Sequence, residues 1–295
     1  MLFNPGESLF LGGFAIGTAT LIDAALIVNQ TYQFGGSAFT WILWGFWWFD
    51  LVISYTTAFG MIYIMFVNHC PQGALLTILY RILTRHHLIE ETTSLWVLPI
   101  IALIVASATG GNMSQALLHY STTLATLTVA FSLVALIIGM SLTLMIITLY
   151  LTRLLLRGPP SPQVAVAAFI VASPLGTAGS SLLVNGRTLS LIFPGYLANS
   201  TFPRIELAGQ ILYALCVCGS FACWSMAFSW LIISTFTVIV VRLRDNIPFR
   251  LSFWGAVFPN GVFALCSVEL GEVFHSPFFN YFGVVWTGMV ISFLK

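Results

Sequence analysis

Long apolar stretches separated by short polar ones dominate the pattern of this chain. Eight of them are long enough to cross a hydrocarbon core of about 30 Å, which needs about 20 helical residues. We place these segments at 8–28, 41–67, 94–110, 122–151, 164–184, 206–241, 253–270 and 278–295. The pattern predicts an all-α polytopic membrane protein with a single transmembrane domain over residues 1–295 and both termini on the same side.

Composition and charge indicate the same class. Hydrophobic residues make up 59% of the 295 residues and charged residues only 6%, whereas a soluble domain carries about a quarter charged residues. No basic tail or cluster is present, so a nucleic-acid partner is not expected. The partner that this composition indicates is the lipid bilayer. The five cysteines fall in apolar segments or on the predicted cytoplasmic side, so no disulfide is expected.

The distribution of arginines predicts the orientation in the membrane. The loops after the second, fourth and sixth segments contain Arg81, Arg85, Arg153, Arg157, Arg242, Arg244 and Arg250. The loops on the opposite side contain only Arg187 and Arg204. By the positive-inside rule, both termini are predicted to be cytoplasmic. The three N-x-S/T sequons, at Asn29, Asn112 and Asn199, all follow odd-numbered segments on the predicted outer side.

The odd-numbered and even-numbered segments differ in character. The odd ones are short and rich in Gly, Ala, Ser and Thr, and three contain a proline, namely Pro99, Pro174 and Pro259. The even ones are bulky and aromatic, as in residues 41–49. Small residues let helices approach closely, and a proline inside a helix bends or opens it. We infer four hairpins around a central axis, each with a kinked inner helix and a lipid-facing outer helix.

Broken helices at membrane depth favour a pathway through the protein. Non-helical backbone is tolerated there only where it is buried in protein or lines a watery cavity. Phe258, directly before Pro259, is the candidate gate of such a pathway. The alternative is that the Pro and Gly residues only provide packing faces, because both are common in transmembrane helices. The recurrence of the pattern in alternate segments favours the pathway.

Several motifs in order along nearly the whole chain resemble the tellurite-resistance/dicarboxylate transporter family. They are Asn4-Pro5-Gly6 with 8–12 (SLFLG), 47–50 (WWFD), 95–111 (LWVLPIIALIVASATGG), 173–176 (SPLG), 253–265 (FWGAVFPNGVFAL) and 275–279 (HSPFF). That family includes fungal sulfite efflux pumps, fungal malic-acid transport proteins, bacterial tellurite-resistance membrane proteins and plant slow anion channels. The SPLG stretch is more similar to the sulfite pumps than to the malic-acid transport proteins.

The resemblance implies ten helices in five hairpins, with odd helices lining a central pore that a phenylalanine on the ninth helix closes. On this sequence that gate is Phe258. It also implies that the chain begins at the family's third helix and is one hairpin short. The implied substrate is a small anion, sulfite in first place, with the C4-dicarboxylate malate as the alternative. A homotrimer in the plasma membrane is implied as well, without a cofactor. Channel and coupled carrier both stay open.

An anion in this pathway would meet few cations. Backbone N–H groups and hydroxyls of the inner helices would have to solvate it. The candidate pore-lining residues are Thr109, Gly110, Gly176, Thr177, Ser180 and Ser267. Arg187 and Arg204 flank the predicted outer mouth, where they either hold anions or are ordinary solvated loop residues.

Ionisable residues within hydrocarbon are costly and are candidates for function. Asp50, near the middle of the second segment, either couples protons or sets the electrostatics of the pore, or it is a structural carboxyl bonded to Ser or Thr on a neighbouring outer helix. We favour the structural role, because a fixed anion would repel an anionic substrate. Asp23 and Glu269 lie toward the outer ends of their segments, where hydration lowers the cost of a charge.

Other classes of protein are less favoured. The sequence has no H-E-x-x-H and no G-x-S-x-G motif, so an intramembrane enzyme is not predicted, and a receptor would leave the repeated kinks unexplained. Residues 74–91 have the spacing of an amphipathic helix on the membrane surface. His86, His87, Glu90 and Glu91 within it could hold a metal, but pairing among these acids and bases is the ordinary alternative, so no metal is expected.

Overall fold

The computed structural model describes residues 11–69, 92–197, 205–248 and 251–292, and this part of the chain is helical without a strand. The prediction of an all-α polytopic membrane protein is confirmed. Six of its helical stretches are long and apolar enough to cross a membrane by length and composition. The predicted surface helix at 74–91, with its two histidines, and the residues Asn199, Arg204 and Arg250 lie outside the described residues.

Eight α-helices and three short 3₁₀ helices follow one another along the described residues. The α-helices are α2 (Leu11–Tyr32), α3 (Gly36–His69), α6 (Leu98–Leu117), α7 (Thr122–Arg157), α8 (Ala172–Leu197), α9 (Ile205–Arg244), α10 (Val257–Phe274) and α11 (Pro277–Ser292). The 3₁₀ helices are η1 (Ser94–Val97), η2 (Val166–Val171) and η3 (Leu251–Ala256). Each α-helix overlaps one of the eight predicted segments, and α7 and α9 are the longest, at 36 and 40 residues.

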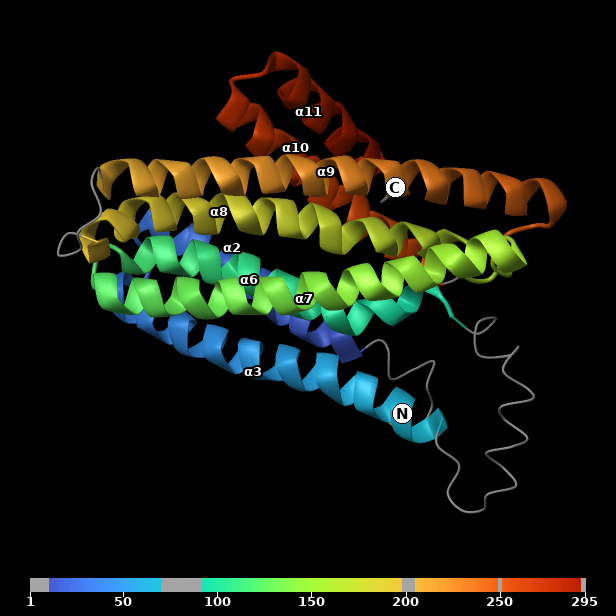
Figure 1. Cartoon of the computed structure of the whole chain (residues 1–295), viewed down its shortest axis with the longest axis horizontal. Helices are drawn as coiled ribbons and strands as arrows, with labels where there is room; N and C mark the ends of the chain where they lie inside the picture. Colours follow the sequence, from blue (N-terminus) through green and yellow to red (C-terminus); the bar gives the residue numbers. More distant parts are fainter. Residues whose placement is uncertain (1–10, 70–91, 198–204, 249–250, 293–295) are drawn as a thin grey trace.

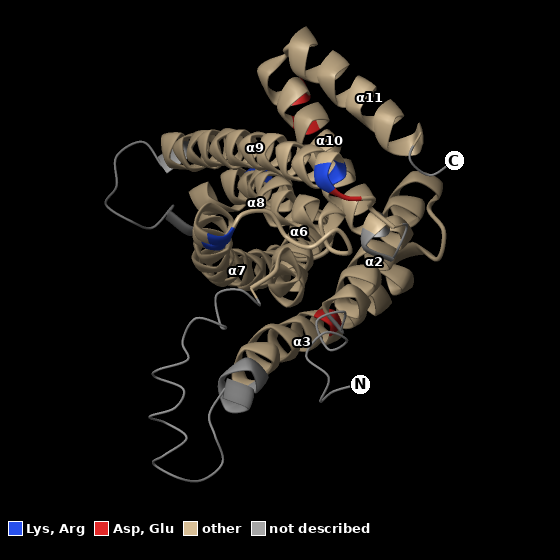
Figure 2. Cartoon of the chain, turned by 90° about the vertical axis from the view of Figure 1, so that its right-hand side faces the viewer, with Lys and Arg blue, Asp and Glu red and all other residues tan. Residues whose placement is uncertain are grey.

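The α-helices pair into four antiparallel hairpins, α2 with α3, α6 with α7, α8 with α9 and α10 with α11 (Figure 1). Neighbouring hairpins meet through their first helices, since α2 packs on α6, α6 on α8, and α8 on α10. Figure 2, which looks along the long helices, shows α3, α7, α9 and α11 on the outside of this arrangement. In the described residues α2 and α10 form no comparable contact with each other, so the row of inner helices is an open ring.

Three of the inner helices begin in the same unusual way. A 3₁₀ helix leads into each of them, η1 into α6, η2 into α8 and η3 into α10, and a proline is the second or third residue of the α-helix that follows. Proline is tolerated in the first turn because no intrahelical bond needs its missing N–H, and it disfavours α-helical geometry before it. The bend predicted at Pro99, Pro174 and Pro259 is therefore a change from 3₁₀ to α geometry at the start of each inner helix.

Buried hydroxyls and amides fasten the inner helices to one another. Ser107 of α6 lies at hydrogen-bond distance from Ser181 of α8, 2.8 Å, and from Ser132 of α7, 3.1 Å. Asn185 of α8 donates to the carbonyl of Ser107 on α6 at 3.4 Å, and Trp47 of α3 donates its indole N–H to the carbonyl of Ala106 on α6 at 2.9 Å. Such bonds are a main source of helix association where water is absent.

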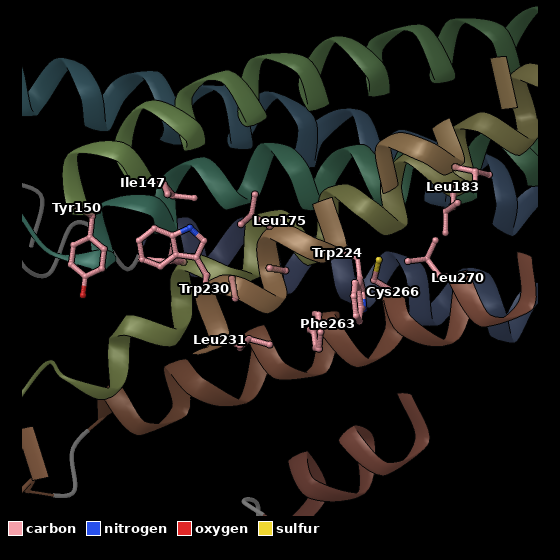
Figure 3. Packing of buried hydrophobic residues seen from close by; sticks show 14 residues of the cluster. Ile147, Tyr150, Leu175, Leu183, Trp224, Trp230, Leu231, Phe263, Cys266 and Leu270 are labelled. Atoms are coloured by element: carbon pink, nitrogen blue, oxygen red, sulfur yellow. The ribbon is translucent and has the colours of Figure 1, made fainter. Parts of the chain in front are cut away.

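A large hydrophobic cluster that includes several aromatic rings packs α10 against α8 and α9 (Figure 3). The rings of Trp224 and Phe263 are stacked with centroids 5.4 Å apart, and the Trp224 indole N–H donates to the Ser267 hydroxyl at 2.8 Å. These contacts fix the rotation of α10 about its own axis. They decide which of its residues point toward the middle of the ring.

Candidate functional site

The face of α10 that begins with Phe258 is a different one from the face that packs on α9. Phe263, Cys266, Ser267 and Leu270 are buried in the outward packing. Residues 258, 262, 265 and 269 recur at helical spacing on the other side, and none of them belongs to the buried core. Leu265 is 54% exposed. We call this face of α10 the inner stripe.

Phe258, at the start of the inner stripe, packs against a cluster formed by α2, by α6 and by the 3₁₀ helices that lead into α6 and α8. Its buried members are Ala19, Val97, Ile101, Val105, Ala167 and Ile170, and Ile16, Leu95, Leu98 and Ile146 are partly buried around them. These residues come from α2, from η1 and α6, and from η2, with Ile146 added from α7. We call this cluster, together with Phe258, the apolar plug. It lies beside the 3₁₀ helices, on the side predicted to be cytoplasmic.

Beyond the plug, the facing surfaces of the inner helices become polar. Asp23 of α2 accepts hydrogen bonds from the Thr109 hydroxyl at 2.8 Å and from the Asn112 amide at 3.0 Å, both on α6. Arg187 of α8 lies 3.9 Å from the Glu272 carboxylate of α10. Most charged and amide side chains of the inner helices therefore lie on the side away from the 3₁₀ helices.

The hydroxyls predicted to line a pore are mostly engaged within the fold. Thr109 donates to Asp23, and Thr177 donates to the carbonyl of Ser173 at 2.9 Å in its own helix. Ser267 donates to the carbonyl of Phe263 at 2.8 Å and accepts from Trp224. Because Ser267 faces the outer helix α9, the interpretation of it as pore-lining is wrong. Ser180 has a buried hydroxyl without a hydrogen-bond partner among the described residues.

The two predicted pore-lining glycines lie at helix contacts. A Cβ on Gly110 would lie 2.7 Å from the indole ring of Trp47. This glycine therefore faces the outer helix α3, which does not fit a role in lining a pore. A Cβ on Gly176 would lie 3.3 Å from the backbone nitrogen of Phe263. Gly176 thus allows α8 and α10 to approach closely, as small residues do in membrane proteins.

Comparison with known proteins identifies the family. A family model described as voltage-dependent anion channel matches residues 1–294. The chain belongs to the voltage-dependent anion channel family. Membership places it among membrane proteins that transport anions, which agrees with the resemblance drawn from the motifs.

Fungal sulfite efflux pumps are among the relatives of this member of the voltage-dependent anion channel family. The sulfite efflux pump of Trichophyton rubrum is 26% identical over 98% of this chain and 70% of its own length. That of Arthroderma otae is 26% identical over 99% of this chain and 70% of its own length. That of Candida albicans is 23% identical over 91% of this chain and 52% of its own length. No solved structure matches the chain.

Asp50 of this channel-family chain is fully buried on α3. Neither of its carboxylate oxygens has a hydrogen-bond partner among the described residues, and the hydroxyl of Ser54, one turn along, lacks one too. The expectation that Asp50 is bonded to Ser or Thr on a neighbouring outer helix is therefore wrong. A structural role for Asp50 would therefore rest on its burial alone and not on a hydrogen bond.

Arg187 and the sequon asparagines Asn29 and Asn112, which were predicted to lie on the outer side, make contacts within the fold. The side chain of Arg187 is 41% exposed and lies 3.9 Å from the carboxylate of Glu272. The sequon residue Asn29 donates to the carbonyls of Phe34 and Gly36 at 2.7 and 3.1 Å, so its amide stabilises the turn between α2 and α3. The amide of Asn112 is bonded to Asp23. Both sequon amides are thus hydrogen-bonded within the fold.

Sequence reasoning missed the residues that meet Phe258. Ile101, Ile170 and Ala19 were not singled out, because an apolar residue in an apolar segment carries no signal of its own. For Ile101 and Ile170 the available clue was their closeness to a proline, since Ile101 follows Pro99 by two residues and Ile170 precedes Pro174 by four. Ala19 had no such signal. In the described part of the chain, no group of three His, Cys, Asp or Glu residues could hold a metal ion.

Proposed function

We propose that this protein moves a small anion, in first place sulfite, across the plasma membrane along the axis between α2, α6, α8 and α10, and that Phe258 gates this route. Both termini are then cytoplasmic and the working assembly is a homotrimer, as the family resemblance implies. The observation that carries the proposal is the apolar plug, in which Phe258 packs with residues from α2, from α6 and from η2, the 3₁₀ helix that leads into α8. Sulfite is favoured over malate because the relatives reported above are sulfite efflux pumps.

An apolar constriction blocks ions because an anion that enters it loses its hydration without gaining other partners. The plug contains only aliphatic side chains and one aromatic ring, so it provides no such partner. A passing anion therefore requires that one member leaves. Phe258 is suited to do so, because it is only partly buried while Ile101, Ile170 and Ala19 are buried between helices.

The direct test replaces Phe258 by alanine in the purified full-length chain. We expect Phe258→Ala to release sulfite from loaded liposomes faster than wild type, because the plug loses its largest side chain. Ile101→Ala should also raise the flux, since it removes volume from the same plug. Leu265→Ala is the matched control, since Leu265 lies on the inner stripe of the same helix but outside the plug.

The outcome that contradicts the gate is a Phe258→Ala flux equal to that of wild type while wild type itself transports. The same liposomes loaded with malate separate the two substrates, because only the transported anion gives flux above protein-free vesicles. An absence of flux with both sulfite and malate would refute the proposed function as a whole.

A further inference from the structure

The inner stripe of α10 ends in a carboxyl group. Glu269 follows Phe258 by eleven residues, which is about three helical turns or about 16 Å along the axis. Eleven residues return a helix almost to the same face, so Glu269 and Phe258 point to the same side. The route that Phe258 closes at one end thus passes Glu269 at the other.

The Glu269 carboxyl lacks the hydrogen bonds that would hold it as an anion. Its Oε2 atom is buried and has no hydrogen-bond partner among the described residues. Asp23, on the opposite side of the ring, differs, because both its oxygens accept a hydrogen bond from α6. A buried carboxylate is stable only when it is paired or hydrogen-bonded. The Glu269 carboxyl has fewer hydrogen bonds than that of Asp23, and its charge is less well compensated.

The other groups around Glu269 leave its charge only partly balanced. From α8 it faces Ser180 and Arg187, and on its own helix it has Cys266 and Glu272 as neighbours. On α9, Cys223 lies beyond Cys266. The segments η2, η3 and α11, which also pack on α10, contain no charged residue. Within the part of the chain that the structure describes, the cation beside Glu269 is Arg187, which also lies 3.9 Å from Glu272 and is therefore shared between two carboxylates.

An ionised Glu269 and an anionic substrate cannot easily occupy this place together. Like charges about 10 Å apart in a medium of effective dielectric constant about 20 lower the occupancy of the site by the order of tenfold. A protonated carboxyl removes that repulsion and adds an O–H donor, which can contact the anion. The hydroxyl of Ser180 on the facing helix, which lies beside the Glu269 carboxyl, would be a second donor at the same level.

We propose that Glu269 is a protonatable gate in the anion route, open to anions when it carries a proton and closed to them when it is ionised. The proposal rests on the proposed function, since it needs an anion route along the inner stripe. Asp23 is unsuited to this role because Thr109 and Asn112 already occupy its oxygens. Glu272 is unsuited because it is 65% exposed and lies beside Arg187.

The test compares sulfite flux of wild type and Glu269→Gln in liposomes, from mildly alkaline to mildly acidic pH. Sulfite itself takes up a proton in this range, so each variant is divided by wild type at the same pH and the speciation of the substrate cancels. We expect Glu269→Gln to be about tenfold faster than wild type at alkaline pH and the ratio to fall toward one on acidification. Glu272→Gln is the matched control, with a ratio that does not change with pH.

A readout without flux completes the test. Infrared difference spectra between acidic and alkaline pH should contain a protonated-carboxyl band that Glu269→Gln removes and Glu272→Gln retains. A flat flux ratio for Glu269→Gln, together with an unchanged infrared band, would overturn the proposal while leaving the proposed function intact. If wild type carries neither sulfite nor malate at any pH, the proposed function fails and the gate with it.

Discussion

Gly12 offers a sharp test of how the inner helices are placed. A Cβ on Gly12 would lie 2.6 Å from the carbonyl oxygen of Leu98 and 2.9 Å from the Cα of Pro99. Both are backbone atoms at the start of α6, where the chain changes from 3₁₀ to α geometry. They cannot rotate away as a side chain could, so α2 and α6 must move apart by about 0.8 Å to reach ordinary van der Waals contact.

We expect Gly12→Ala to lower the free energy of unfolding by about 1 to 3 kcal/mol, the usual cost of overpacking. The displacement should also weaken the apolar plug, because Ile16 and Ala19 follow Gly12 by one and two turns on the same helix and belong to that cluster. Sulfite leak from liposomes should therefore rise. Unfolding in a denaturing detergent and flux are measured on the same preparation.

The adjacent glycine is a control of the same type. A Cβ on Gly13 would meet nothing within 4 Å, so Gly13→Ala should leave stability unchanged or raise it by up to about 1 kcal/mol, since alanine favours the helix. If Gly12→Ala is as stable as Gly13→Ala and as tight to sulfite, the contact between α2 and the first turn of α6 is not as described and the plug argument loses its geometry.

The remaining predictions concern buried polar groups. Asp50→Leu should be neutral or stabilising, because neither Asp50 oxygen has a hydrogen-bond partner among the described residues, whereas Asp23→Leu should cost about 1 to 3 kcal/mol because it leaves the Thr109 and Asn112 donors unpaired. The two thermal unfolding midpoints check this, and equal shifts would contradict it. Trp224→Phe should cost about 1 kcal/mol through the lost bond to Ser267, and a double-mutant cycle with Ser267→Ala that shows no coupling would refute that bond.

The sequence was sufficient for the helices but not for their faces. Length and hydropathy locate the eight α-helices of the described residues, and the contrast between small and aromatic segments separates inner from outer helices. The sequence alone did not predict that Ser267 faces α9 or that Gly110 faces Trp47. The reason is physical, because helices that are apolar all round have no polar face to reveal their rotation. Their rotation is set by side-chain contacts between distant segments, such as the stack of Trp224 on Phe263.

The prolines illustrate a second limit. Pro99, Pro174 and Pro259 correctly mark irregular backbone in alternate segments, but a proline in the sequence does not say whether it bends a helix in the middle or begins a new one. Here each is preceded by a 3₁₀ helix and lies in the first turn of the α-helix. Whether a proline bends a helix or begins a new one depends on whether the residues before it adopt 3₁₀ geometry. The packing of neighbouring helices influences that choice, and the local sequence does not reveal it.

The two ends of the inner stripe should affect transport in different ways. The plug around Phe258 has no polar partner for an anion, so it forms the barrier that an anion must cross and sets the maximal rate. Glu269 lies in the more polar part of the route and changes how readily an anion occupies it. Phe258→Ala should therefore raise mainly the maximal flux, and Glu269→Gln should mainly lower the sulfite concentration at half-maximal flux. Equal effects of both variants on both quantities would mean that a single constriction holds both residues, against the separation of about 16 Å along α10.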